Sequence, residues 1–247
     1  MPQSKGALVL DVIEIQQKSS QGRTEPYLCR LSDNKHYYIK GPQAGCKGLI
    51  NEAVCAYLGQ ALQLKVPAYC CAYLPQGLLH FDYVASRVLG AGDSVVFASE
   101  LVPDLLEVTP TSVLSMPESY ARDLFLFDYW IRNEDRTITE NGGNPNLFYQ
   151  AASKQYIVID HNLAFETDYN FKDNAKLHLA YNAWFGSQHD ALWRTHYSAK
   201  LAIALQGLPQ YAATLPPEWL AEEPGYLAEI NDILASFNSD EFWEVLI

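Results

Sequence analysis

Along its first ninety residues the chain alternates short apolar runs with polar clusters, a pattern typical of β-strands joined by turns. After the third of these runs, apolar residues recur at helical spacing from Leu49 to Leu62, which predicts a helix with one apolar face. The pattern therefore predicts five strands and one helix in this region. The predicted strands cover residues 7–15, 26–31, 36–40, 66–74 and 78–89.

The rest of the chain is predicted to be mainly helical. Beyond the glycine-rich segment Gly90–Asp93, our candidate for a hinge, apolar residues recur on one helical face between Tyr120 and Ile131. A polar loop follows, and then two short apolar runs, residues 147–149 and 156–159, which predict a β-hairpin.

This order of elements predicts an α+β fold built from two lobes. Residues 1–90 would form a small β-rich lobe, and residues 91–247 a larger, mainly helical lobe that carries the hairpin.

Composition and charge restrict the function classes. The formal net charge is −12, and no run of Lys or Arg is present, so neither nucleic acid nor an anionic membrane is an expected partner. The apolar run near the N-terminus contains Asp11 and Glu14 and lacks a cleavage pattern, so we expect no signal peptide. The five cysteines include no C-x-x-C pair and are interpreted as free thiols of a reducing compartment. We therefore expect a cytoplasmic protein.

Three oxygen-bearing side chains surround the predicted hairpin. Asp135 lies in the loop before it, Asn146 directly precedes its first strand, and Asp160 directly follows its second. If residue 150 pairs with 156 and residue 147 with 159, Asn146 lies opposite Asp160. Such oxygen donors suit Mg²⁺, and phosphoryl transfer needs that metal together with a carboxylate that takes the hydroxyl proton. The alternative interpretation is a polar turn leading into a surface hairpin, where Asp and Asn are common.

A second pair of charged residues lies in the β-rich half. Lys40 ends a predicted strand, and Glu52 lies in the first turn of the predicted helix that follows. Kinases use a strand lysine held by a helix glutamate to direct an ammonium group at the phosphates of ATP. The alternative interpretation is a solvated charge at each position, which is the default for Lys and Glu.

Taken together, several motifs resemble those of the HipA-like kinases, in particular the short stand-alone members of that family. The resemblance runs from about residue 25 to residue 165 and continues weakly to Leu215–Trp219. The motifs are Tyr38–Gly41, Asn51–Glu52, Phe127–Ile131, Asn133–Arg136, Asn144–Leu147 and Ile159–Phe165.

The resemblance implies a bilobal kinase fold, distantly similar to phosphoinositide kinases, that binds ATP and Mg²⁺ between its lobes. It places Asp135 and Arg136 in the catalytic loop, with Asp135 as the base that receives the hydroxyl proton. It assigns Lys40 and Glu52 to ATP binding.

For the metal, the resemblance implies Asp160 together with an asparagine. The loop after Asp135 looks longer than the family pattern, so Asn144 is an alternative to Asn146. The segment Lys18–Thr24 is either the loop that covers the phosphates or a mobile polar turn.

The implied activity is transfer of the γ-phosphate of ATP to a hydroxyl group, on Ser or Thr of a protein or of the chain itself. Better-known relatives are bacterial toxins, which makes an antitoxin-like protein a further candidate partner. Two alternatives stay open: a kinase that acts on a small molecule or lipid, and a nucleotide-binding pseudokinase that regulates a partner protein.

Overall fold

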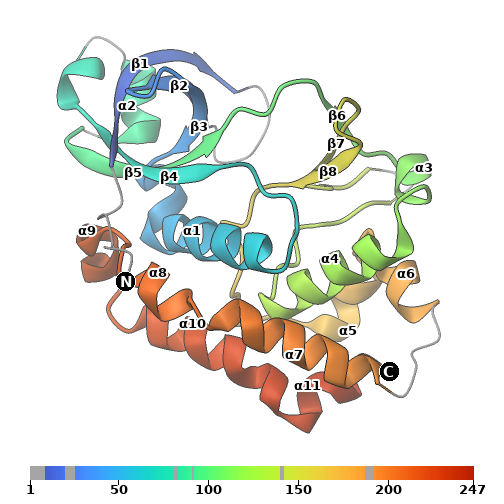
Figure 1. Cartoon of the computed structure of the whole chain (residues 1–247). Helices are drawn as coiled ribbons and strands as arrows, with labels where there is room; N and C mark the ends of the chain where they lie inside the picture. The colour runs from blue at the N-terminus through green and yellow to red at the C-terminus, as the bar shows by residue number, and fades with distance from the viewer. Residues whose placement is uncertain (1–8, 20–25, 81–82, 91, 140–141, 187–191) are drawn as a thin grey trace, which may run out of the picture.

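The computed structural model describes residues 9–19, 26–80, 83–90, 92–139, 142–186 and 192–247. The strands and helices form two groups of elements, and each group has a hydrophobic core of its own (Figure 1). The chain is thus a mixed α+β protein, as predicted.

The first group is a closed barrel with the strand order β1-β2-β3-β5-β4. Neighbouring strands are antiparallel except for β1 and β4, which pair in parallel where the barrel closes. Side chains that alternate along the strands, such as Cys29, Leu31 and Ile39, are fully buried inside it. The strands are β1 (Leu10–Lys18), β2 (Tyr27–Leu31), β3 (His36–Lys40), β4 (Tyr69–Leu74) and β5 (Ser94–Glu100).

The prediction of a strand over residues 78–89 is wrong, because most of that segment forms the helix α2 (Tyr83–Leu89). Ala85, Val88 and Leu89 are buried at helical spacing and pack into the core of the barrel. A short apolar run fits a strand or a buried helix equally well, and here the packing against the barrel selects the helix.

The fifth strand is β5 instead, and it follows the glycine-rich segment that we interpreted as a hinge. The barrel therefore extends beyond residue 90. Gly92 has φ of 95°, and a Cβ there would lie 2.3 Å from the Cα of Gln76. Only glycine fits this tight turn between α2 and β5.

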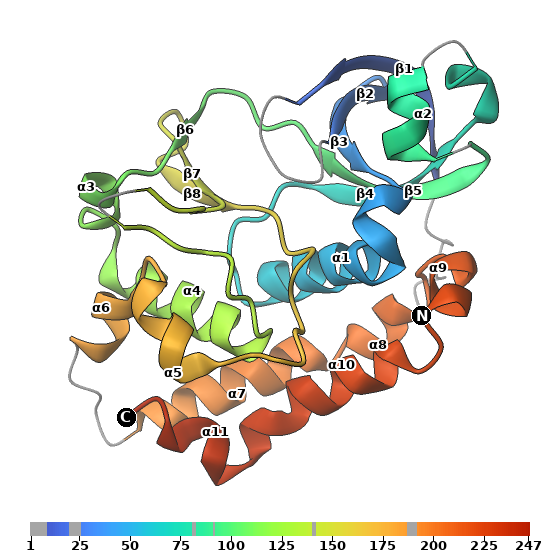
Figure 2. The same cartoon turned by 180° about the vertical axis from the view of Figure 1, so that it is seen from behind.

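The helix α1 (Gly45–Ala61) begins four residues earlier than the predicted start at Leu49 and connects the two groups. It contacts β4 and β5 on one side and α7, α8 and α9 on the other. Figures 1 and 2 both show it between the barrel and the layer of C-terminal helices. Because it is covered on both sides, most of its central residues are buried, including the polar Asn51 and Glu52.

The second group contains a three-stranded antiparallel sheet of β6 (Leu105–Glu107), β7 (Leu147–Gln150) and β8 (Gln155–Val158), in that order. The predicted hairpin is present, but the predicted register is wrong by one residue. Leu147 pairs with Val158 and Gln150 with Gln155, so Asn146 lies opposite Ile159 and not opposite Asp160. A four-residue loop, in which Lys154 has φ of 56°, sets this register.

Helices form the remainder of the second group. Its core buries the aromatic rings of Phe125, Trp130 and Trp184. Within the described residues, no helix combines the length and the apolar character needed to cross a bilayer. The helices are α3 (Pro110–Val113), α4 (Glu118–Trp130), α5 (Phe171–Asn174), α6 (Tyr181–Phe185), α7 (Trp193–Leu205), α8 (Leu208–Ala212), α9 (Pro217–Glu222), α10 (Tyr226–Ala235) and α11 (Asp240–Glu244).

Candidate functional site

The structure joins three charged residues from three elements. Lys40 is the last residue of β3, Glu52 lies on α1, and Asp160 follows β8. The Nζ atom of Lys40 donates to Oε1 of Glu52 and, at 2.7 Å, to Oδ1 of Asp160. The three side chains are only 11%, 4% and 17% exposed. The two constellations found in the sequence, the lysine–glutamate pair and the hairpin, thus meet at one point.

The charges of Lys40 and Asp160 stabilise each other, whereas burial and the neighbouring Asp160 raise the pKa of Glu52. Burial by itself would lower the pKa of Lys40, but the carboxylates of Glu52 and Asp160 raise it above its ordinary value. Burial opposes ionisation of Asp160 as well, yet the ammonium group of Lys40 lowers the pKa of this carboxyl. At neutral pH the site therefore holds a charged lysine beside an ionised Asp160.

Asp135 lies in the loop after α4 and contacts both candidate asparagines. Its Oδ2 accepts hydrogen bonds from Nδ2 of Asn144 at 2.6 Å and from Nδ2 of Asn146 at 3.0 Å. Asn144 is exposed, whereas Asn146 is 8% exposed. The backbone oxygen of Asn146 accepts from the amide of Ile159 at 3.1 Å, one residue before Asp160. The loop and the open end of the hairpin are therefore in direct contact.

Arg136, which we grouped with Asp135 as catalytic, is completely buried. Its guanidinium donates to Oδ2 of Asp128 at 2.7 Å and to the backbone oxygens of Asn146 and Ile159. It also lies 3.2 Å from Nε2 of His161. Arg136 thus ties the loop that carries Asp135 to both strands of the hairpin, and its side chain is not exposed at the surface.

Asp128, on α4, is the buried counter-ion of this arginine; it lies within the motif Phe127–Ile131, but we assigned it no role from the sequence. Its carboxylate also accepts from Nδ2 of Asn133 at 2.7 Å and lies 2.9 Å from Nε2 of His178. Burial favours the protonated acid, but Arg136 and His178 hold the pKa of Asp128 well below its usual range. Its place in that motif, and an aspartate among the apolar residues of a predicted helix, were the sequence signals for it.

His161, beside Asp160, is 1% exposed and was also not identified. Burial and the nearby charge of Arg136 lower the pKa of His161 to about 3. The ring is therefore neutral at physiological pH, and its Nε2 can accept a hydrogen bond from the guanidinium of Arg136.

The donor set fits a hard cation. Asp160 offers a carboxylate and Asn146 an amide oxygen, and Mg²⁺ takes such oxygen ligands and keeps others from phosphates and water. The Asn146 amide donates to Asp135 through Nδ2, and its Oδ1 accepts no hydrogen bond from any residue that the structure describes. Among the described residues, no group of three or more His, Cys, Asp or Glu side chains has the geometry to hold a metal ion.

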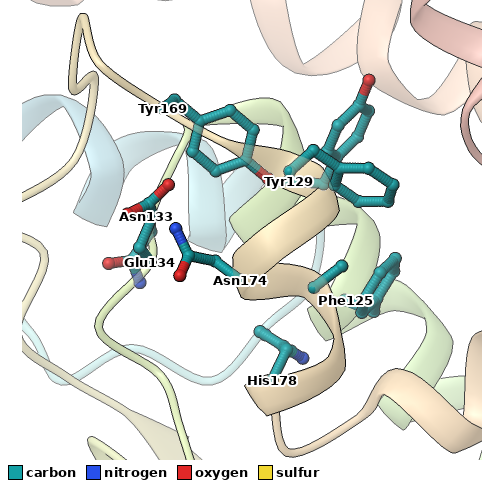
Figure 3. A pocket seen from close by; sticks show the side chains of 9 residues that line it. Phe125, Tyr129, Asn133, Glu134, Tyr169, Asn174 and His178 are labelled. Atoms are coloured by element: carbon teal, nitrogen blue, oxygen red, sulfur yellow. The ribbon is translucent and has the colours of Figure 1, made fainter.

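Two hollows lie near these residues. The smaller, of about 20 Å³, is bordered by Asn133, Glu134, Tyr169, Asn174 and His178 next to the loop of Asp135 (Figure 3). Its volume suits one water molecule and excludes a substrate.

The larger hollow, of about 630 Å³, lies at the barrel edge where β1 and β3 end and is lined by residues that include Lys18, Gln43 and Arg87. Of the candidate phosphate-covering loop, Lys18 and Ser19 are described, and residues 20–24 lie outside the described part of the chain.

Comparisons with known proteins show the family and the fold of the chain. A family model described as HipA-like kinase matches residues 12–246. Among solved structures, the chain is similar to the proinflammatory kinase CtkA of Helicobacter pylori, with a TM-score of 0.53 and 11% identity over 97% of this chain and 100% of that one. This likeness shows a shared fold. No curated protein matches the sequence.

A second solved structure, the open conformation of CtTel1, matches with a TM-score of 0.30 and 10% identity. The match covers 90% of this chain and 11% of CtTel1. A similarity this low carries no weight for the fold or the site.

Proposed function

The chain belongs to the HipA-like kinase family, and from this premise we propose that it transfers the γ-phosphoryl group of ATP to the hydroxyl group of a serine or threonine in a protein. The observation that carries the proposal is the position of Lys40 between Glu52 and Asp160. A buried ammonium group held between two carboxylates does not contribute to an apolar core. Kinases use a lysine paired with a glutamate, beside a metal-binding aspartate, to bind and align ATP phosphates.

In this proposal ATP lies between the barrel and the β7–β8 hairpin, and the two groups of elements are the lobes of a bilobal kinase. Lys40 contacts the phosphates, and Glu52 keeps the lysine in place. Asp160 and Asn146 hold Mg²⁺, with Asn144 as the alternative to Asn146. When bound, the metal neutralises negative charge on the phosphates.

Asp135 is the proposed catalytic base. It accepts hydrogen bonds from two amide groups, which fix the direction of its carboxylate. A carboxylate oriented in this way can align the attacking hydroxyl group and take its proton in the transition state. Arg136 does not touch the reacting groups in this proposal. It is a positioning residue that holds the loop of Asp135 against the hairpin.

The acceptor is either a separate protein or the chain itself. An antitoxin-like protein that binds the kinase remains part of the proposal as a partner class. The site favours an active enzyme over a pseudokinase. Lys40, Glu52, Asp135 and Asp160 are all present, and each contacts another residue of the proposed site.

The test is incubation of the purified protein with γ-labelled ATP and Mg²⁺, alone and with mixed protein acceptors, followed by phosphoamino-acid analysis. Label on serine or threonine is expected, and Asp135→Asn should remove it. A thermal shift with unlabelled ATP accompanies the assay, since a ligand at about 100 times its Kd stabilises the folded state by about 2.7 kcal/mol. If millimolar Mg·ATP causes no thermal shift and no label is transferred, the proposed function is refuted.

A further inference from the structure

The residue before Glu52 on α1 is an asparagine that is only 3% exposed. Nδ2 of Asn51 donates to the backbone oxygens of Asn162, at 3.0 Å, and Ala164, at 2.8 Å. Glu52 adds a third contact, because its Oε2 accepts the amide of His161 at 3.2 Å. Two consecutive side chains of α1 thus fasten the segment that follows Asp160, which runs beside α1 in Figures 1 and 2.

The orientation of the Asn51 amide is fixed by a residue far along the chain. The hydroxyl of Tyr226, at the start of α10, lies 2.7 Å from Oδ1 of Asn51. The backbone oxygens of Asn162 and Ala164 can only accept, so the amide nitrogen must face them and the amide oxygen must face Tyr226. Every hydrogen-bonding group of this buried amide has a partner, and the ring of Tyr226 is itself packed beneath the Nζ atom of Lys47 at 4.7 Å from its centroid.

The fastened segment adopts an unfavourable backbone conformation at both ends. Asp160 has φ of 59° and Phe165 has φ of 60°. Aspartate tolerates the left-handed region, but a bulky aromatic residue there is an outlier. Such residues are strained and persist only where the surrounding contacts hold them. The amide of Phe165 donates to Ile131 at 2.7 Å, and Asn51 holds the middle of the segment.

We propose that Asn51 is a positioning residue for Asp160. By fixing residues 161–164 to α1, it sets the carboxylate of Asp160 beside Lys40. This inference rests on the proposed function, because it takes Asp160 as the metal ligand. Groups that orient a metal ligand typically change metal affinity 10–100-fold when they are removed.

The test compares three variants with wild type. Asn51→Asp keeps the shape but turns a carboxylate oxygen toward two backbone oxygens, Asn51→Ala removes all three contacts, and Tyr226→Phe removes one hydroxyl. Tyr129→Phe is the matched control, because the hydroxyl of Tyr129 donates to the backbone of Phe242 at 3.0 Å, on a helix that is not part of the site.

Two measurements apply to each protein. The first is the Mg²⁺ concentration that gives half-maximal binding of a non-hydrolysable ATP analogue, by calorimetry. The second is amide hydrogen exchange over residues 160–165 without ligand. We expect Asn51→Asp to need about tenfold more Mg²⁺ and to exchange faster in this segment. Tyr226→Phe should change both measurements in the same direction to a smaller extent, and Tyr129→Phe should change neither.

Folded Asn51 variants with the wild-type Mg²⁺ requirement and wild-type exchange would overturn the inference. If neither variant folds, Tyr226→Phe decides the question by the same two measurements. A wild-type protein that binds the analogue without any dependence on Mg²⁺ would instead refute the proposed function, so the two failures are distinguishable.

Discussion

Lys40 and Asp160 are 120 positions apart in the chain, yet Nζ of the lysine lies 2.7 Å from Oδ1 of the aspartate. The contact joins the last residue of a barrel strand to the residue that follows the hairpin, and Glu52 completes it from α1. It makes the two groups of elements depend on each other electrostatically, because among the described residues no other lysine or arginine forms an ion pair with either carboxylate.

Replacing Lys40 by methionine should therefore affect both activity and stability. Phosphoryl transfer should be lost, since the cation that aligns the phosphates is gone. The free energy of unfolding should fall by about 3 kcal/mol, because two buried carboxylates lose their counter-ion. Lys35→Met is the matched control, since Lys35 is 56% exposed and pairs with Glu100 at the surface. Full activity in the Lys40 variant would show that Lys40 is not the phosphate-binding lysine, and Lys35 or Lys47 would then be the candidates.

The two aspartates of the site should differ in what they lose. Asp160→Asn should abolish the Mg²⁺ dependence of nucleotide binding together with activity, because the metal ligand acts in the ground state and the transition state alike. Asp135→Asn should still bind nucleotide but lose turnover by about 10²–10⁴-fold, as is typical when a general base is missing. Calorimetric ATP titrations with and without Mg²⁺, beside a transfer assay, separate the two phenotypes. An exchange of the two outcomes would show that the roles are reversed.

The buried imidazole of His161 should make stability depend on pH. The pKa of His161 is about 3 in the folded protein, against an ordinary value of 6.5. Below pH 6.5 the unfolded chain therefore binds a proton that the folded chain does not, and stability falls as the pH falls. The contribution approaches about 1.4 kcal/mol per pH unit.

Denaturant unfolding at several values between pH 5 and pH 6.5 measures this slope. We expect His161→Gln to remove the contribution, so that stability varies less with pH than in wild type. This window lies above the range in which Asp128 and Asp160, whose pKa values are lowered, begin to lose their stabilising charge. Equal slopes for wild type and variant would show that the ring is protonated in the folded state.

Arg136 should matter more for stability than an exposed arginine does. Arg136→Ala leaves the buried carboxylate of Asp128 without its main partner, which typically costs about 3–5 kcal/mol. Arg194→Ala is the control, because the side chain of Arg194 is 46% exposed and pairs with Asp240 at the surface, so its loss should change stability by less than about 1 kcal/mol. Chemical denaturation measures both. A similar loss in the two variants would mean that the buried pair contributes no more than a surface pair.

The sequence by itself supplied the candidate residues of the site. The order of Asp135, Asn146 and Asp160 around a hairpin, and the spacing of Lys40 and Glu52 over a strand and a helix, are local features that short-range patterns specify. The family resemblance drawn from these motifs is confirmed, and the family match covers residues 12–246. The mixed α+β class followed from the same patterns, because strand and helix periodicities are distinct over most of the chain.

Only the tertiary structure decided which partners these residues have. Residues 83–89 form a helix because their apolar face packs on the barrel, and the hairpin register follows from a loop that is one residue shorter than we assumed. Three further features depend on groups more than twenty positions away or on elements packed above them. They are the burial of Arg136, the neutral state of His161 and the contact of Asn51 with the segment after Asp160. Sequence patterns report the face on which a residue lies, whereas burial and hydrogen-bond partners depend on which distant elements cover that face.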